Sequence, residues 1–235
     1  MKRTVVKILA VFLAALAAYS GCRAWAVLAD YKAEENMRGQ VAEYKPRPVS
    51  AVESVINQSV IDLQAIHPDV AGWLYIPGTE IDYPFVWYEN NDHYLRRDLN
   101  GGGARAGTIF MDYRCDRAFS SSNTILYGHH MKNGSMFGTV KLFADEAFFN
   151  ENLYGTVYLP RETLTLAFFA YMEIRSTDSE IYSLEPSETY MAYVRQTARH
   201  CRDTELAQGD RIVTLSTCAY ASGGGARAVL VGKVV

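Results

Sequence analysis

The 235-residue sequence has little of what marks several large classes of protein. It has no excess of basic residues, since 23 Lys and Arg stand against 26 Asp and Glu, and a formal charge of −3 argues against nucleic acid as a partner. It has only four cysteines, whose spacing shows no paired pattern, so a disulfide-bonded scaffold is not indicated. It also has no internal repeat and no low-complexity tract. The length is enough to bury one substantial core, and we expect one folded domain.

Basic residues precede an apolar run at the N-terminus. Arg3 and Lys7 lead into the apolar residues 8–21, and a second apolar piece, residues 24–29, follows Arg23. Basic residues ahead of such a run favour a cytoplasmic N-terminus. The uninterrupted run is shorter than the roughly 20 residues that a membrane span needs. Lys7 and Arg23 can extend it, because long basic side chains snorkel to the membrane surface.

We therefore interpret residues 1–29 as a membrane signal-anchor, residues 30–49 as a polar stalk and residues 50–235 as an extracellular folded domain. This predicts a single-pass protein of the cell membrane with its N-terminus in the cytoplasm. Two alternatives remain open for the N-terminus. One is a cleaved signal peptide, and the other is a lipoprotein-like cleavage site ahead of Cys22.

From residue 70 onwards, short β-branched and aromatic runs alternate with turns rich in Gly, Asn and Asp. A helix is expected from an N-cap at Ser50 to Pro68, and another within residues 184–200, where Tyr190 and Val194 share one helical stripe. Eight short strands with one inserted helix predict a mainly β fold, a closed or nearly closed β-barrel. The strands are expected at residues 72–76, 81–87, 107–111, 123–127, 155–159, 163–173, 211–217 and 227–235.

Cys218 stands at the end of a strand-like segment, Thr214-Leu215-Ser216-Thr217-Cys218. A Gly-rich turn follows, and the next predicted strand opens with Arg227. A thiolate is a strong nucleophile, and an arginine stays charged and can stabilise the oxyanion that forms when a carbonyl is attacked. These two residues on neighbouring strands indicate attack on an amide carbonyl. For Cys218 alone, the alternative is a buried structural cysteine.

His129 is the candidate acid and base. It follows the predicted strand at residues 123–127, and a histidine near a thiol lowers the thiol pKa and carries protons. A base far from its cysteine in sequence is the usual pattern, because the two meet in the fold. We expect His130 to be structural. A zinc site that uses both histidines would lack a third ligand at suitable spacing, and no acid is marked as a third triad member.

These motifs resemble the sortases, and class B most closely. The motifs are YGHHMKNGSMFG at residues 127–138, TLSTC at residues 214–218, and Arg227, with further similar segments at residues 76–84 and 107–114. They lie in the order expected for the family and cover about residues 50–235. The resemblance implies an eight-stranded barrel with an N-terminal helical segment and a helix inserted before the seventh strand. It also implies the catalytic residues His129, Cys218 and Arg227.

The resemblance implies a membrane-anchored cysteine transpeptidase of Gram-positive bacteria. Such an enzyme cleaves a C-terminal sorting motif of a secreted protein through a thioester at Cys218. It then transfers the acyl group to an amine of a cell-wall precursor peptide, and no metal or organic cofactor is needed. Two alternatives are a cysteine peptidase that uses water as acceptor and an inactive sortase-like binding module. Substrate contacts are expected from Tyr127, Ser216, Thr217 and Tyr190, and packing is the alternative role for these residues.

Three further expectations concern cysteines, a pair of charges and a loop. If Cys22 lies in the anchor and Cys218 is reactive, the one remaining disulfide would join Cys115 and Cys201, and we expect both as unpaired thiols. Asp112 and Arg114 are expected to pair with each other as part of the scaffold. The loop at residues 219–226 is short and almost uncharged, where class B sortases often have a longer, more acidic loop.

Overall fold

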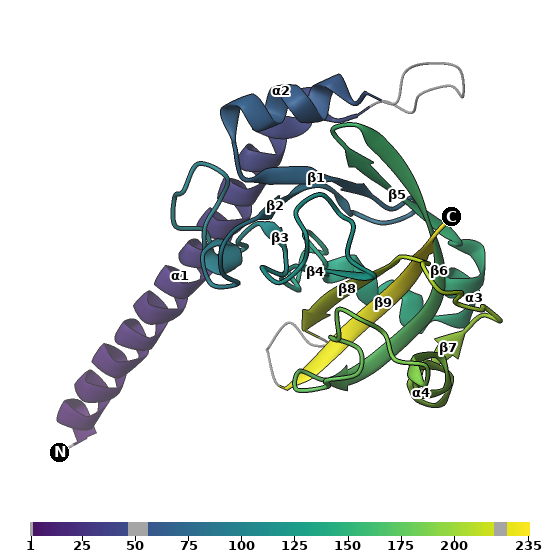
Figure 1. Ribbon diagram of the computed structural model, residues 1–235. Helices are drawn as coiled ribbons and strands as arrows, with labels where there is room; N and C mark the ends of the chain where they lie inside the picture. The colour runs from purple at the N-terminus through teal and green to yellow at the C-terminus, as the bar shows by residue number, and fades with distance from the viewer. Residues whose placement is uncertain (1, 47–55, 219–224) are drawn as a thin grey trace.

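The computed structural model describes residues 2–46, 56–218 and 225–235, with a barrel-shaped domain and one long helix that projects from it (Figure 1). The helices, in chain order, are α1 (Lys2–Val41), η1 (Ala42–Tyr44), α2 (Gln58–Ile66), η2 (Tyr94–Arg96), η3 (Gly138–Ala144), α3 (Glu146–Glu151) and α4 (Tyr190–Thr197). The strands are β1 (Val70–Tyr75), β2 (Asp82–Trp87), β3 (Ile109–Met111), β4 (Asn123–Tyr127), β5 (Tyr154–Leu159), β6 (Glu162–Arg175), β7 (His200–Cys201), β8 (Ile212–Cys218) and β9 (Ala226–Val234).

Eight of the nine described strands close into a ring. The order is β5-β1-β2-β3-β4-β8-β9-β6, and β6 pairs with β5 to complete it. The pairs β2–β3 and β4–β8 are parallel, and the other neighbours in the ring are antiparallel. Closure leaves no long unpaired edge around the barrel. The predicted eight-stranded barrel is confirmed.

The inserted helix is confirmed within the predicted range. α4 precedes β8, which is the seventh barrel strand in chain order, and it buries Tyr190 and Val194 against β6 and β9. The structure adds the two-residue strand β7 between α4 and β8, and β7 pairs with β6 through Ala170 and Tyr171. The sequence analysis did not predict this strand.

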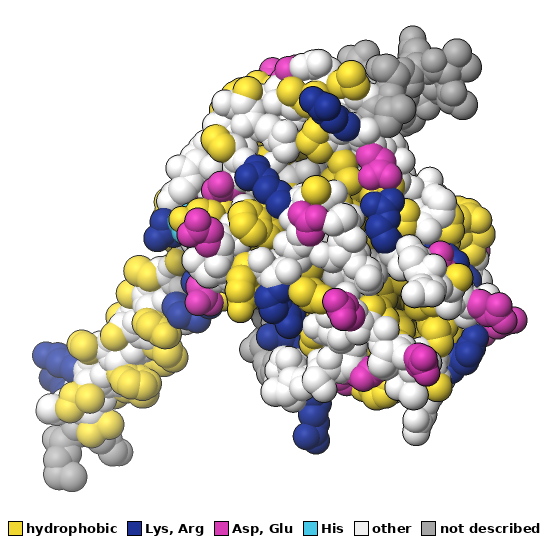
Figure 2. Space-filling model, viewed as in Figure 1, with side chains coloured by type: hydrophobic (Ala, Val, Ile, Leu, Met, Phe, Trp, Pro, Cys, Tyr) yellow, Lys and Arg dark blue, Asp and Glu magenta, His cyan; other side chains and the backbone are white. Residues whose placement is uncertain are grey.

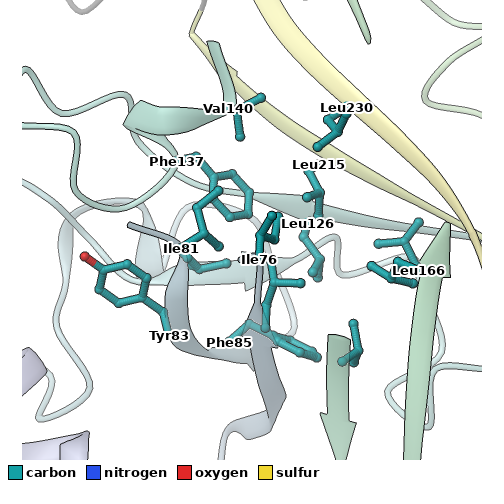
Figure 3. Packing of buried hydrophobic residues seen from close by; sticks show 14 of the residues in the cluster. Ile76, Ile81, Tyr83, Phe85, Leu126, Phe137, Val140, Leu166, Leu215 and Leu230 are labelled. Atoms are coloured by element: carbon teal, nitrogen blue, oxygen red, sulfur yellow. The ribbon is translucent and has the colours of Figure 1, made fainter. Parts of the chain in front are cut away.

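The barrel interior is filled by apolar side chains. Phe85 from β2, Leu126 from β4, Leu215 from β8 and Leu230 from β9 are all fully buried and meet Ile76 in one cluster (Figure 3). A core packed in this way leaves no lumen for a ligand, because protein interiors approach crystal density. A functional site must therefore lie at the rim of the barrel.

α2 begins later than the sequence suggested. The described residues Ile56 and Asn57 are not helical, and α2 begins at Gln58; the expected N-cap at Ser50 lies outside the described residues. The buried Asn57 amide donates to the carbonyl groups of Leu159 and Glu162 in the β5–β6 hairpin. These hydrogen bonds hold the chain in a non-helical conformation just before α2.

α1 has two halves with different surroundings. In its first half, apolar side chains such as Val11 and Phe12 are exposed, and they cover the projecting part of the helix (Figure 2). Its length and hydropathy are sufficient for a membrane span, and the most apolar window has no buried residue. From Asp30 onwards, where a stalk was expected, the chain stays helical to Val41, which is buried against α2 and β1. The predicted boundaries of anchor and stalk remain predictions.

Candidate active site

The candidate site lies at the edge of the barrel where β4 and β8 end. Parallel strands run in the same direction, so their carboxyl ends, Tyr127 and Cys218, reach the same rim. The antiparallel strand β9 starts at this rim. An open cleft of about 630 Å³ lies here, and its lining includes Tyr127, His129, Ser216, Thr217 and Arg227. Five of the seven predicted site residues thus line one cleft.

The strand register places the candidate nucleophile directly opposite the candidate cation. Cys218 is the last residue of β8, and in the β8–β9 pair it faces Arg227, the second residue of β9. On the other side of β8, the Gly128 N–H donates to the Ser216 carbonyl at 3.2 Å. The segment that carries His129 is therefore hydrogen-bonded to β8 two residues before Cys218.

The His129 ring is oriented by a backbone carbonyl. Its Nε2 lies 2.7 Å from the carbonyl oxygen of Leu95, so Nε2 carries the proton and Nδ1 is left as the acceptor. Burial lowers the pKa of His129, and the hydrogen bond to Leu95 opposes this. The positive charges of Arg96, Arg227 and Arg105 lower the pKa further. The arrangement favours a neutral imidazole that can accept a proton.

The loop between Gly128 and Gly138 is tightly folded, which explains its glycines. A Cβ on Gly128 would lie 2.7 Å from the Phe137 ring, and a Cβ on Gly138 would lie 2.6 Å from the Met131 carbonyl oxygen. The Phe137 N–H donates to the His129 carbonyl at 3.0 Å, and the fully buried Phe137 ring packs into the barrel core (Figure 3). His130, next in sequence, is buried and pairs in a β-bridge with Met136. Close packing thus fixes the backbone on both sides of His129.

An ionised carboxylate supports the floor of the cleft. Asp112 is buried and accepts two hydrogen bonds of 2.9 Å from the Arg114 guanidinium, which confirms the predicted pair. Burial alone would raise the pKa of Asp112, but the hydrogen bonds and charge of Arg114, with a hydrogen bond from Tyr127, lower it. The Tyr127 hydroxyl donates to Asp112 at 3.0 Å. The Tyr127 ring is therefore held in one orientation along the cleft.

Ser216 and Thr217 differ in how their hydroxyls are satisfied. The Ser216 hydroxyl lies 2.8 Å from the Tyr182 hydroxyl, and the Tyr182 carbonyl accepts from Arg114 at 3.3 Å. The Thr217 hydroxyl is buried and has no hydrogen-bond partner among the described residues. Sequence reasoning did not single out Tyr182 or Leu95. Tyr182 lies in an irregular segment, and the Leu95 contact is made by a main-chain carbonyl, which leaves no signal in the residue type.

The structure does not bring Tyr190 into this group. Its side chain is fully buried beneath α4, with Phe169, Val194 and Ile212 around it. Its hydroxyl lies beside Thr214 without a well-aligned hydrogen bond. Tyr190 therefore packs α4 against the sheet, outside the cleft.

The other cysteines are unpaired, as expected. Cys115 is buried, and burial raises the pKa of its thiol to about 11, which leaves almost no thiolate at neutral pH. Cys201 is exposed on β7 and Cys22 is exposed on α1. The alternative disulfide between Cys115 and Cys201 is not formed.

Comparison with known proteins gives a consistent result. No family model matches the chain. Sortase B of Listeria monocytogenes is 34% identical over 202 residues, which are 81% of this chain and 80% of that protein. Sortase B of Staphylococcus aureus is 31% identical over 184 residues, 74% of this chain and 73% of that protein.

Solved structures agree with the sequence relatives. Sortase B from B. anthracis in complex with AAEK1 has a TM-score of 0.76 and 32% identity, and the match covers 88% of this chain and 99% of that one. Clostridium perfringens sortase B has a TM-score of 0.68 and 34% identity, with 74% and 98% covered. The similarity thus extends over nearly the whole length of these solved chains. The protein belongs to the class B sortases, which are cysteine transpeptidases.

Proposed function

We propose that this sortase cleaves a sorting motif near the C-terminus of a secreted protein and joins the new carboxyl end to an amine of a cell-wall precursor peptide. The observation that carries the proposal is the register of β8 and β9, which sets Cys218 opposite Arg227 at a cleft that His129 also lines. This supports a site in which the nucleophile, the base and the cation act on one carbonyl group.

In the first half of the reaction, the Cys218 thiol gives its proton to the neutral His129 imidazole and the thiolate attacks the carbonyl carbon of the scissile amide. Arg227 stabilises the negative charge that develops on the carbonyl oxygen. The His129 imidazolium then gives the proton to the departing amine, the C–N bond breaks, and a thioester at Cys218 remains.

In the second half, an amine of the cell-wall precursor attacks the thioester carbonyl. His129 accepts the proton that this amine loses, and Arg227 again stabilises the oxyanion. The C–S bond breaks, an amide forms, and the proton returns to the Cys218 sulfur. Because the chemistry is divided into two steps, a second amine can take the place of water.

Three further cleft residues support recognition of the peptide. Tyr127, Ser216 and Thr217 line the cleft beside the reacting groups, so we assign them to substrate contact. Tyr190 was expected in the same role, but its burial under α4 supports a packing role instead. The identity of the sorting motif would be set by this cleft and by the loop that follows Cys218.

We also propose that α1 anchors the enzyme in the cell membrane with the catalytic domain outside. The exposed apolar side chains on the projecting part of α1 support a span (Figure 2). Arg3 and Lys7 precede most of that apolar surface, and basic residues at this end favour a cytoplasmic N-terminus. The active-site cleft would then work where secreted substrates and cell-wall amines are found.

The test uses the full chain in detergent with a library of sorting-motif peptides, with and without an added amine. We expect wild-type protein to form an acyl-enzyme detectable by mass spectrometry and then an amine adduct, while Cys218→Ala forms neither. Cys115→Ala and Cys201→Ala are matched controls that should retain activity. Cleavage by Cys218→Ala would refute the proposal, and hydrolysis without any amine adduct would favour a peptidase.

A further inference from the structure

A single hydroxyl group connects α1 with the loop that carries His129. The Tyr83 hydroxyl, on β2, donates to the Glu34 carboxylate of α1 at 2.9 Å and accepts from the Met136 N–H at 3.3 Å. Tyr83 is 5% exposed, and its hydroxyl points away from the core residues Phe85 and Leu126 (Figure 3). Both hydrogen-bonding functions of the hydroxyl are thus used, one on each side.

Met136 is a position where the backbone needs support. It has a φ of 54°, a left-handed conformation that methionine rarely adopts, and it is 3% exposed. It pairs with His130, and the next residue, Phe137, donates its N–H to the His129 carbonyl. The Tyr83 hydroxyl therefore supports the chain directly opposite the two histidines.

The ring of His129 is connected to α1 by a second route. The Leu95 carbonyl that accepts from Nε2 belongs to η2, and the chain that follows η2 runs along α1. Arg105 of that chain lies 3.6 Å from Asp30 of α1. Both the backbone and the ring of His129 are thus held by parts of the domain that rest on the same helix.

Docking of α1 does not itself require the buried hydroxyl. The buried Val41 packs between α2 and β1, and Arg38 forms a 3.0 Å ion pair with Glu80. A phenylalanine at position 83 would keep the apolar contacts of the ring. A buried hydroxyl with a matched donor and acceptor adds a fixed geometry that packing alone does not supply.

We propose that Tyr83 and Glu34 are positioning residues for His129, so that α1 holds the catalytic base in place as well as anchoring the chain. This rests on the proposed function of His129. Removal of the hydroxyl leaves the buried Met136 N–H unpaired and releases the strained turn, and a displacement of about 1 Å at a reacting group can lower a rate about 100-fold. The peptide contacts at Tyr127 and Ser216 come from other strands and stay in place.

The experiment measures transfer kinetics of the full chain in detergent. We expect Tyr83→Phe and Glu34→Ala to lower kcat roughly tenfold, with KM of the sorting peptide changed less than about twofold. Glu34→Gln should restore most of the rate, because its amide oxygen accepts the same hydrogen bond. Glu80→Gln is the matched control, since it removes the exposed ion pair with Arg38 of the same helix and leaves both hydrogen bonds of the Tyr83 hydroxyl in place. Its kcat should equal that of wild type.

A spectroscopic measurement separates positioning from general loss of structure. In folded wild type, 15N NMR of His129 should report the Nε2–H tautomer, and Tyr83→Phe should show an average of both tautomers. An unchanged kcat in Tyr83→Phe, an equal loss in Glu80→Gln, or a Glu34→Gln as impaired as Glu34→Ala would overturn the proposal. If Tyr83→Phe does not fold, the comparison of kcat between Glu34→Ala and Glu34→Gln tests the proposal instead. Full activity in His129→Ala would instead refute the proposed function.

Discussion

At the scale of single residues, His129 differs from a histidine held by a carboxylate. Its ring donates to a neutral carbonyl at Leu95, and the charges that act on it most are those of Arg96, Arg227 and Arg105. A carboxylate partner would favour the imidazolium, whereas burial and cations favour the neutral ring. In the mechanism proposed above, a neutral ring of this kind takes a proton first and returns it once the amide nitrogen starts to leave.

The cations around His129 lead to a prediction about the pH dependence of activity. Arg96→Gln removes a cation that disfavours the imidazolium, so the pKa of His129 should rise towards its ordinary value. A higher pKa leaves less neutral imidazole at acidic pH. The acid limb of the kcat/KM profile should therefore move to higher pH. Arg97→Gln, on the neighbouring exposed residue, is the control. A limb that stays in place or moves to lower pH would contradict the charge argument.

Thr217 allows substrate contact and packing to be separated. Its hydroxyl is buried and has no hydrogen-bond partner in the described part of the chain, so Thr217→Val should leave the free energy of unfolding unchanged or raise it by up to about 1 kcal/mol. If the hydroxyl binds the peptide, kcat/KM should fall roughly tenfold, the equivalent of about 1.4 kcal/mol. Thr139→Val is the control, because its hydroxyl is also buried, likewise has no hydrogen-bond partner among the residues that the structure describes, and lies outside the cleft. Equal kinetics in the two variants would count against substrate contact by Thr217.

At the scale of elements, the sequence predicted the strands best where they carry a continuous pattern. β4 ends at the expected residue and β8 one residue beyond it, since each carries an unbroken run of buried residues. β7 has only two residues, too few for any period to be read, and it exists because the edge of β6 is there to pair with. The helical continuation of α1 to Val41 escaped prediction because only one face of it meets the barrel.

The same reasoning applies to the candidate site. His129, Cys218 and Arg227 could be proposed from the sequence because attack on an amide carbonyl calls for a nucleophile, a base and a cation, and these residue types lie at predicted strand ends. The role of the Leu95 carbonyl could not be predicted, since every residue has a main-chain carbonyl and the residue type does not show what it contacts. For Tyr190, which lies on a helical stripe, both substrate contact and packing were open; stripes of that period more often face a core, and this one does.

Arg202 provides a prediction for the elements on the far side of the barrel. Directly after β7, its guanidinium donates to the carbonyl groups of Phe168 and Phe149 and lies 3.8 Å from the centre of the Phe149 ring. It thereby joins β6, at its bulge, to α3. Arg202→Ala should lower the free energy of unfolding by about 2 to 3 kcal/mol, since hydrogen bonds to a charged group are worth about 1.5–3 kcal/mol. Chemical denaturation would measure this.

The matched control for Arg202 is Arg195→Ala, which removes an exposed arginine whose nearest carboxylate, Asp203, is 3.8 Å away. An exposed pair of this kind contributes little, so this variant should lose less than about 1 kcal/mol. The kcat of Arg202→Ala should stay near that of wild type at temperatures where the protein is folded. Stability losses of the same size in both variants would show that the guanidinium does not join the elements.

At the scale of the whole molecule, the filled barrel presents the cleft, and the continuous helix α1 connects the barrel to the exposed apolar segment. The core holds eight strands in a fixed register, so their rim can present a cleft without any lumen. α1 runs without a break from its exposed apolar half to the contacts at Asp30, Glu34 and Val41. A membrane that held the first half would therefore hold the barrel in a restricted orientation, because no flexible segment among the described residues separates the two halves.

The last prediction concerns that apolar half. Leu13 lies near its middle and is 54% exposed, so Leu13→Lys would place a charge near the centre of the span. A lysine there should disfavour insertion by about 3 kcal/mol, and a glycosylation reporter in microsomes would measure the fraction of inserted chains. Leu142→Lys, an exposed leucine on η3, should leave insertion unchanged. Because the same substitution on the barrel controls for a general effect of lysine, equal insertion of the two variants would refute the span and leave α1 as a docking helix only.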